Sequence, residues 1–451
     1  MRCSALVWLL IAALGPAAAS AAEHVVLVSI DGFAAYHLYD QQLELPNIRS
    51  LIREGVWASS SETVFPSVTH PSHTTMLTGV EPRLHGVLSN RLRNRETGES
   101  FHPTNKPRTE IVRVPTLFDL AKEAGLSTAS FFWPETRDDP AVDFNIPEVL
   151  DADNKAEPSA LDPRFAERLE EAGVPIHLYY RWYGTERQGA GDLILAEAAA
   201  HVIRSEKPNL LAIHILVTDK AQHDYGPHHY LAKAALTMAD ACVGILRQAL
   251  EDAGVGDQSV IIVTADHGFH SVSHELNVRP FFERAGLLDR LELAGGGWSL
   301  AVRLKESFEP ATDLPRLEKV FEELRANPYV ARIVGPDELH ALGQPRYEES
   351  PYAFGHYLVI PDIDTYLVSE PGDSTERRPR PEASHSHGYL PQHPRMHTSL
   401  VLWGDGVRRG ETIGHVRNLD IAPTIAELLD LDLEQGSGRA LEEALQPEGK
   451  R

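Results

Sequence analysis

Apolar, β-branched runs alternate with segments of helical spacing along most of the chain. Strands are predicted at residues 24–30 (HVVLVSI), 126–132, 210–217 (LLAIHILV), 259–263 (SVIIV) and 398–402. Helices are predicted at 46–54, 115–124, 192–205, 228–251 and 421–429. Several of the strands are apolar throughout, which is typical of parallel strands covered on both faces. The pattern therefore predicts an α/β fold with a mostly parallel sheet sandwiched by helices.

Two regions interrupt this alternation. Residues 133–191 are rich in Pro, Asp, Glu and aromatics and contain no clear βα unit, so we interpret them as an insertion that caps the sheet. Residues 295–385 contain short strand-like pieces and a predicted helix at 314–325, and we expect a smaller α+β insertion with a Pro-rich loop at 370–385. The expected organisation is 23–294 for the main α/β core, 295–385 for this insertion and 386–451 for the return to the core.

The N-terminus has the pattern of a signal peptide. Arg2 precedes an apolar run at 5–14, and small residues follow at 17–22. We predict a secretory signal over residues 1–22, cut after Ala22, with Ala19 and Ala21 as alternative cleavage sites. The apolar run is too short to span a bilayer, and no later run is long enough. We expect a periplasmic or extracellular protein without a stable membrane anchor.

The composition limits which binding partners are expected. The 451 residues are 42% apolar and 24% charged, with a net charge of -23. Such an anionic chain repels nucleic-acid polymers and acidic lipid surfaces, although bound metal would still permit a small anionic substrate. Two cysteines, Cys3 and Cys242, exclude a disulfide framework. The oligomeric state stays open.

Candidate metal ligands follow three predicted strands. Asp31, Asp219 and Asp266 each come at a strand end, and ligands bind at the carboxyl ends of strands in open α/β sheets. A single aspartate there is more often a turn or N-cap residue, but three converging carboxylates need a neutralising cation. Histidines accompany them at His223 and His267, and four more cluster at 385–397. Carboxylate and imidazole together favour zinc or a similar divalent ion.

A candidate nucleophile precedes a short predicted helix at 71–78, which ends at Gly79. Thr69 lies at or just before its N-terminus, where free N–H groups favour negative charge. Spacing alone fits a helix N-cap equally well.

Together these motifs resemble the nucleotide pyrophosphatase/phosphodiesterase family of the alkaline phosphatase superfamily. The resemblance covers most of residues 24–290 and about 385–430. The motifs occur in the family order at 29–32 (SIDG), 65–73 (FPSVTHPSH), 77–79 (LTG), 85–87 (HGV), 219–227, 266–268 (DHG), 387–389 (HGY) and 420–424 (DIAPT).

The resemblance implies two zinc ions per chain and a role for each motif residue. It matches Thr69 to the nucleophile and Asn90 to an amide that donates to a phosphoryl oxygen. The implied metal ligands are Asp31, Thr69, Asp266 and His267 for one ion, and Asp219, His223 and His387 for the other. His385 remains an alternative to His387. Many members have Asp-Asn after the His-Gly-Tyr motif, where this chain has Leu390 and Pro391, so part of the substrate pocket differs.

The implied function is a secreted two-zinc phosphodiesterase or nucleotide pyrophosphatase that forms a covalent phosphothreonine intermediate. Two divalent ions would balance three aspartates and an ionised Thr69, leaving a neutral site for an anionic ester. The alternatives are a phosphomonoesterase or phosphonate hydrolase on the same site, and a non-catalytic binding protein on the same fold. A sulfatase is disfavoured because the chain has no Cys/Ser-x-Pro-x-Arg motif.

Overall fold

A mostly parallel eight-stranded sheet forms the centre of the protein. The structure is a computed structural model that describes residues 22–151, 153–434 and 436–447, so the expected signal peptide lies outside the described residues except for Ala22. In spatial order the strands are β17 (Glu411–Arg417), β2 (Val56–Glu62), β16 (Leu400–Gly404), β8 (Ser259–Thr264), β1 (His24–Ile30), β7 (Leu210–Ile215), β5 (Thr128–Phe131) and β6 (Phe144–Ile146). Only β16 among them runs antiparallel to its neighbours. The predicted fold class is confirmed.

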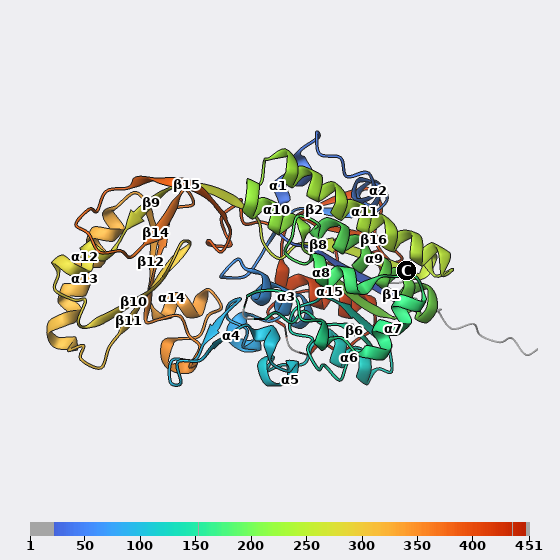
Figure 1. Cartoon of the computed structure of the whole chain (residues 1–451), viewed down its shortest axis with the longest axis horizontal. Helices are drawn as coiled ribbons and strands as arrows, with labels where there is room; N and C mark the ends of the chain where they lie inside the picture. The colour runs from blue at the N-terminus through green and yellow to red at the C-terminus, as the bar shows by residue number, and fades with distance from the viewer. Residues whose placement is uncertain (1–21, 152, 435, 448–451) are drawn as a thin grey trace, which may run out of the picture.

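Helices cover both faces of this sheet (Figure 1). Alternate residues of β1 point to opposite sides: Val26 and Val28 join one apolar core, whereas Val25 and Leu27 join the other. The first core is completed by α2 (Pro46–Glu54), α8 (Ile176–Trp182), α9 (Gln188–Glu206) and α11 (Tyr230–Asp252). The second is completed by α3 (Thr69–Thr78), α6 (Leu117–Glu123) and α15 (Ile421–Leu428).

Local signals define several of these helices. Pro46 begins α2 and Gly55 ends it, as predicted. A capping box of Thr116 and Asp119 begins α6. Gly79 ends α3 with φ of 66°, a left-handed conformation that favours glycine.

The segment at 133–191 extends the sheet as well as covering it. Its strand β6 pairs in parallel with β5 at the sheet edge, a pairing that the sequence does not predict because a three-residue strand (Phe-Asn-Ile) leaves no periodic pattern in it. The segment also contains α7 (Pro163–Glu171) and α8, which packs on α9.

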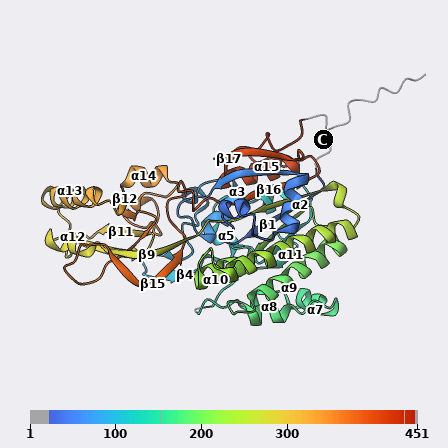
Figure 2. The same cartoon turned by 90° about the horizontal axis from the view of Figure 1, so that it is seen from above.

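A smaller α+β unit projects from the main body (Figures 1 and 2). Its boundaries differ from the expected 295–385, because β9 (His270–Asn277) and β10 (Leu291–Gly296) already belong to its sheets. One sheet has four strands and the other has three. The four-stranded sheet has the order β10, β11 (Ser299–Leu304), β13 (Tyr357–Pro361) and β12 (Val330–Val334). The three-stranded sheet has the order β14 (Thr365–Val368), β9 and β15 (Arg378–Ser386).

The expected loop at 370–385 is partly wrong, since β15 occupies its second half. This strand is polar and contains Pro379 and Pro381, but it lies at a sheet edge and pairs irregularly with β9. Edge strands tolerate proline because one side of their backbone needs no partner. Helices α12 (Arg279–Arg284), α13 (Pro310–Ala326) and α14 (Pro336–Ala341) complete the unit.

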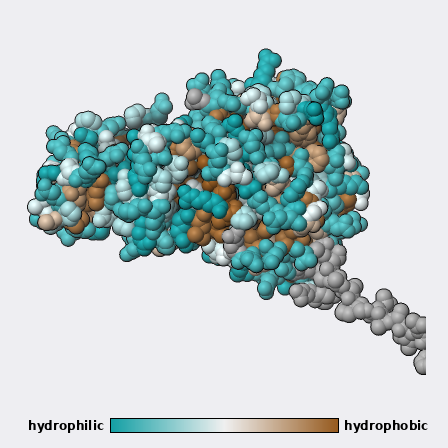
Figure 3. Space-filling model, turned by 90° about the horizontal axis from the view of Figure 1, so that it is seen from below, coloured by the Kyte–Doolittle hydropathy of each residue, from teal (hydrophilic) through white to brown (hydrophobic). Residues whose placement is uncertain are grey.

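Short elements connect these parts: α1 (Ala35–Tyr39), α4 (Pro82–His85), α5 (Arg108–Ile111), α10 (Val217–Tyr225), and the hairpin of β3 (Leu92–Arg93) and β4 (Ser100–Phe101). Among the described residues, no helix combines the length and apolar character needed to cross a membrane. The face in Figure 3 is largely hydrophilic, with apolar residues gathered near the middle of the molecule.

Candidate metal and nucleophile site

Three neighbouring parallel strands bring the predicted aspartates together. Asp31 follows β1, Asp266 follows β8, and Asp219 lies in the first turn of α10 after β7. Since β8, β1 and β7 are adjacent and parallel, their carboxyl ends share one edge of the sheet. The aspartates and their histidine partners form two groups.

The first group consists of Asp31, Asp266 and His267. His267 Nε2 lies 3.3 Å from Asp31 Oδ1 and 3.2 Å from Asp266 Oδ2. The backbone N–H of Gly32 donates to Asp266 Oδ1 at 3.0 Å, which orients the other oxygen toward the histidine. Gly32 has φ of 70°, and a Cβ there would approach Gln222 Nε2 to 2.8 Å, so this close turn requires glycine.

The second group consists of Asp219, His223 and His387. Asp219 Oδ1 lies 3.3 Å from His223 Nε2 and 3.7 Å from His387 Nε2. The three side chains could hold one ion. His387, not His385, supplies the ring: His385 bonds Ser271 Oγ through its own ring, and its backbone carbonyl accepts from His223 Nδ1.

Backbone carbonyls orient all three histidines. His223 Nδ1 donates to His385 O at 2.7 Å, His267 Nδ1 to Gly268 O at 3.0 Å, and His387 Nδ1 to Ser67 O at 3.0 Å. These bonds place the proton on Nδ1 and leave the Nε2 lone pair directed at the carboxylates. Metal-binding histidines are characteristically oriented in this way.

Several buried ligand atoms have no hydrogen-bond partner. They are Asp31 Oδ1, Asp219 Oδ1, Asp266 Oδ2 and His267 Nε2. Burial, followed by the charges of Asp266 and Asp219, raises the pKa of Asp31 well above its usual value. Buried polar atoms are ordinarily satisfied, and crowded carboxylates are unfavourable without a cation. The donor set therefore fits two divalent ions.

Thr69 is the first residue of α3. Val68 occupies the N-cap position, and no side-chain cap bond is present, so the N-cap interpretation of Thr69 is wrong. The hydroxyl instead lies where the first backbone N–H groups of the helix are free of helical partners.

Contacts on either side of Thr69 tie it to both ligand groups. Ser67 O accepts from His387 Nδ1. The Thr69 carbonyl accepts from His73 Nδ1 at 2.8 Å, and the same nitrogen lies 3.9 Å from Asp266 Oδ2. The turn that carries Thr69 is thus fixed between the two groups.

Asn90 faces the Thr69 hydroxyl. Its Nδ2 donates toward Thr69 Oγ1 at 3.4 Å, and its Oδ1 accepts from the His70 N–H at 2.9 Å. The second bond fixes the amide orientation, so the NH₂ group points to the space beside the hydroxyl. An anionic oxygen bound there would accept from it.

A buried histidine on β7 was missed by the sequence reasoning. His214 Nε2 donates to Asp31 Oδ2 at 3.1 Å, and His214 Nδ1 lies 3.7 Å from Glu148 Oε2. Burial lowers the pKa of His214, but the bonds to Asp31 and Glu148 outweigh it and raise the pKa well above the usual value. The available signal was a lone polar residue inside an apolar strand.

A second buried pair lies behind the nucleophile turn. His70 Nδ1 and Glu135 Oε1 are 2.6 Å apart, and Thr74 Oγ1 donates to Glu135 Oε2 at 3.0 Å. Glu135 comes from the segment at 133–191, so that segment supports the first turn of α3.

The fold places the protein in a known structural class. Solved structures of murine and human ectonucleotide pyrophosphatase/phosphodiesterase 5 match 94% of this chain and 100% of theirs, with a TM-score of 0.68. Their sequence identities are 19% and 18%. One of the murine structures is an inactive variant in complex with AMP.

Sequence comparison identifies the family. The profile of the type I phosphodiesterase / nucleotide pyrophosphatase family matches residues 25–390. The chain belongs to this family, and the resemblance inferred from its motifs is confirmed.

The curated relatives are much longer than the matched region. Ectonucleotide pyrophosphatase/phosphodiesterase family member 3 of Rattus norvegicus is 26% identical over 251 residues, which are 55% of this chain and 25% of that protein. Member 1 of Homo sapiens is 25% identical over 55% of this chain and 24% of its own length. Venom phosphodiesterase 2 of Crotalus adamanteus is 25% identical over 55% of this chain and 27% of its own length.

Proposed function

We propose that this protein is a secreted, two-zinc hydrolase of phosphoric diesters, of the phosphodiesterase or nucleotide pyrophosphatase type, with Thr69 as nucleophile. The observation that carries the proposal is that two neighbouring carboxylate–imidazole groups are each linked by contacts to the turn that carries Thr69. Their unpartnered oxygens and nitrogen support metal binding at both.

The ligand types favour zinc. Asp31, Asp266, His267 and the Thr69 hydroxyl would hold one ion, and Asp219, His223 and His387 the other. The ions would lower the pKa of the threonine hydroxyl and offset negative charge on the phosphoryl group and the leaving oxygen.

The chain supplies a nucleophile and its alignment. The Thr69 oxygen attacks phosphorus, its proton passes to solvent, and the bond from phosphorus to the leaving oxygen breaks. The Asn90 amide and the backbone N–H of Thr69, at the N-terminus of α3, donate to the non-bridging oxygens as charge builds on them. A water molecule then attacks the phosphothreonine diester, breaks the Thr69–phosphorus bond and releases a phosphoric monoester. Two in-line attacks give net retention at phosphorus.

A diester or nucleotide substrate is favoured over a monoester. Lys220, the cation nearest to Asp219 in sequence, pairs with Asp224 at 2.6 Å, so its charge is already balanced by a carboxylate and is not free for the second negative charge of a monoester. The names of the relatives and the AMP complex of a structural neighbour support a nucleotide substrate.

The test is a substrate panel on zinc-loaded mature protein. We expect kcat/KM to be higher for bis-p-nitrophenyl phosphate and p-nitrophenyl thymidine monophosphate than for p-nitrophenyl phosphate. A preference for the thymidine compound over the simple diester would place a nucleoside subsite beside the centre. Faster cleavage of the monoester than of either diester would reverse the assignment in favour of a phosphomonoesterase.

We also propose that the protein is exported. The signal peptide predicted from the sequence and the names of the ectoenzyme and venom relatives both support export. Mass spectrometry of exported protein should find an N-terminus at Glu23, or at one of the two alternative cleavage positions. An intracellular protein that keeps residues 1–22 would contradict it.

A further inference from the structure

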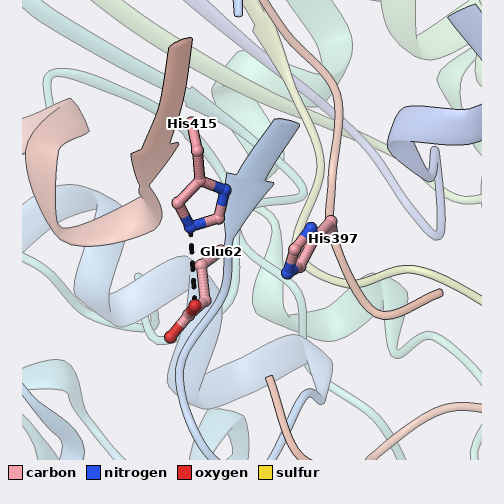
Figure 4. Close-up of side chains that lie close together, drawn as sticks. All are labelled: Glu62, His397 and His415. Carbon is pink, nitrogen blue, oxygen red and sulfur yellow. Dashed lines mark ion pairs between the residues drawn. The ribbon is translucent and has the colours of Figure 1, made fainter. Parts of the chain in front are cut away.

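A second histidine–carboxylate cluster lies outside the site described above. Glu62 ends β2, His415 lies on β17, and His397 precedes β16 (Figure 4). Their ligand atoms all lie within 4.8 Å of one another. None of the three belongs to the family motifs that carry Thr69 and its metal ligands.

The distances suit a tetrahedral ion. His415 Nε2 and Glu62 Oε2 are 3.5 Å apart, and Figure 4 shows them facing each other with the His397 ring beside them. Two ligands each about 2.0–2.2 Å from a tetrahedral zinc lie roughly 3.4 Å apart. The rings of His397 and His415 have centroids 4.9 Å apart, and the ligand atoms of all three residues lie within 4.8 Å of one another, which brings His397 within reach of the same ion.

Each member of the cluster is oriented by a further contact. His415 Nδ1 bonds Ser60 Oγ at 2.8 Å, and Glu62 Oε1 accepts from Gln392 Nε2 at 3.3 Å. The His397 ring bonds the backbone carbonyl of Gln392, while its Nε2 is buried without a partner. This pattern satisfies one atom of each side chain and leaves the other for an ion.

Solvent can reach the cluster. The His415 side chain is 44% exposed and that of Glu62 is 24% exposed. Glu62 also lines a cleft of about 160 Å³ together with Gln392 and Arg417. Three protein ligands with an open side leave a fourth position for water.

We propose that Glu62, His397 and His415 bind one further divalent transition-metal ion, of the zinc class, separate from the catalytic centre. The ion would join β2, β17 and the segment before β16. It would also steady the turn to the nucleophile, because Thr63 follows Glu62 and its hydroxyl donates to Asp266 O at 2.5 Å.

The test counts metal ions. Purified full-length mature protein is stripped with chelator and titrated with Co²⁺ or Zn²⁺, and bound metal is measured by elemental analysis. We expect His415→Ala and Glu62→Gln to bind one ion fewer than the wild type. His274→Ala, on β9 in the smaller unit, is the matched control and should bind the wild-type number.

The measured quantity is the difference of one bound ion per chain between wild type and variant, and it does not depend on how many ions the candidate centre at Thr69 binds. Combining His415→Ala with Asp219→Ala should remove one ion more than Asp219→Ala alone. Added metal should also raise the Tm of the wild type more than that of His415→Ala, with circular dichroism verifying that both are folded. Equal metal content in wild type, folded His415→Ala and folded Glu62→Gln would overturn the proposal.

Discussion

The two halves of the candidate centre differ in their exposure to solvent. In the half formed by Asp31, Asp266 and His267, the side chains are 6%, 0% and 0% exposed. In the half formed by Asp219, His223 and His387, they are 24%, 40% and 12% exposed. We call these the buried half and the open half.

The difference follows from where the ligands lie on the fold. The buried half comes from the tips of two central strands, β1 and β8, whereas the open half comes from α10 and from the segment that follows β15. Charges are costlier in the buried half because water cannot stabilise them. We infer that the buried half fixes the nucleophile, while the open half faces the leaving group and solvent.

The largest expected effect tests whether Thr69, which the buried half is inferred to hold in place, is the nucleophile. Thr69→Ala should fold, retain bound metal and lose turnover by about 10⁴-fold or more, because it lacks the oxygen that is proposed to attack phosphorus. Thr69→Ser should keep part of the activity, since it keeps the hydroxyl. Steady-state kinetics and metal analysis check both variants. Wild-type turnover in Thr69→Ala would mean that water attacks directly.

Asn90 tests whether a group outside both halves stabilises the transition state. Asn90→Ala should lower kcat by about 10²- to 10³-fold, as expected for one lost donor to a developing oxyanion. Metal content should stay unchanged, because Asn90 belongs to neither half. A loss of metal in this variant would instead indicate that the amide acts by holding the α3 turn in place.

A His214 variant should lower the metal affinity of one half and not of the other. It donates to Asp31 Oδ2, so His214→Ala should weaken metal binding at the buried half by about 10- to 100-fold. The open half should keep its affinity. Competition with a chromophoric chelator can resolve the two affinities. An equal loss of metal affinity at both halves would contradict the division into a buried and an open half.

The smallest expected effect concerns the metal-free protein. Asp266→Asn should raise the free energy of unfolding of the metal-free protein, because the charge of Asp266 is the largest contribution after burial to the raised pKa of Asp31. The amide still accepts from the Gly32 N–H through its oxygen. Asp219→Asn, in the open half, should change the free energy of unfolding by less. Urea unfolding of chelator-treated protein measures the change in each variant. A larger stabilisation by Asp219→Asn than by Asp266→Asn would show that solvent exposure does not govern the repulsion between the carboxylates.

Much of the catalytic core could be predicted from the sequence. Continuous apolar runs predict β1, β7 and β8, and helix signals predict α2 with its observed bounds. Strand ends in a parallel sheet lie at one edge, so Asp31, Asp219 and Asp266 could be expected to meet. The order of the motifs added Thr69 and the histidines. These features depend on local chemistry and on a general rule of sheet geometry.

Other features depended on partners distant in the sequence. The polar strand β15 forms because β9 offers an edge, and β6 forms because β5 does. A polar segment is stable as a strand only where another backbone satisfies its hydrogen bonds, which its own side chains do not reveal.

The sequence alone thus determined the parallel core and the residue types of its centre. The tertiary structure decided which histidine faces Asp219, that His214 supports Asp31, and that Glu62, His397 and His415 share one place. The last three are joined by the strand order β17-β2-β16, which sets residues more than 300 positions apart side by side. Strand order is chosen by the burial of whole faces of the sheet, and no local pattern encodes it.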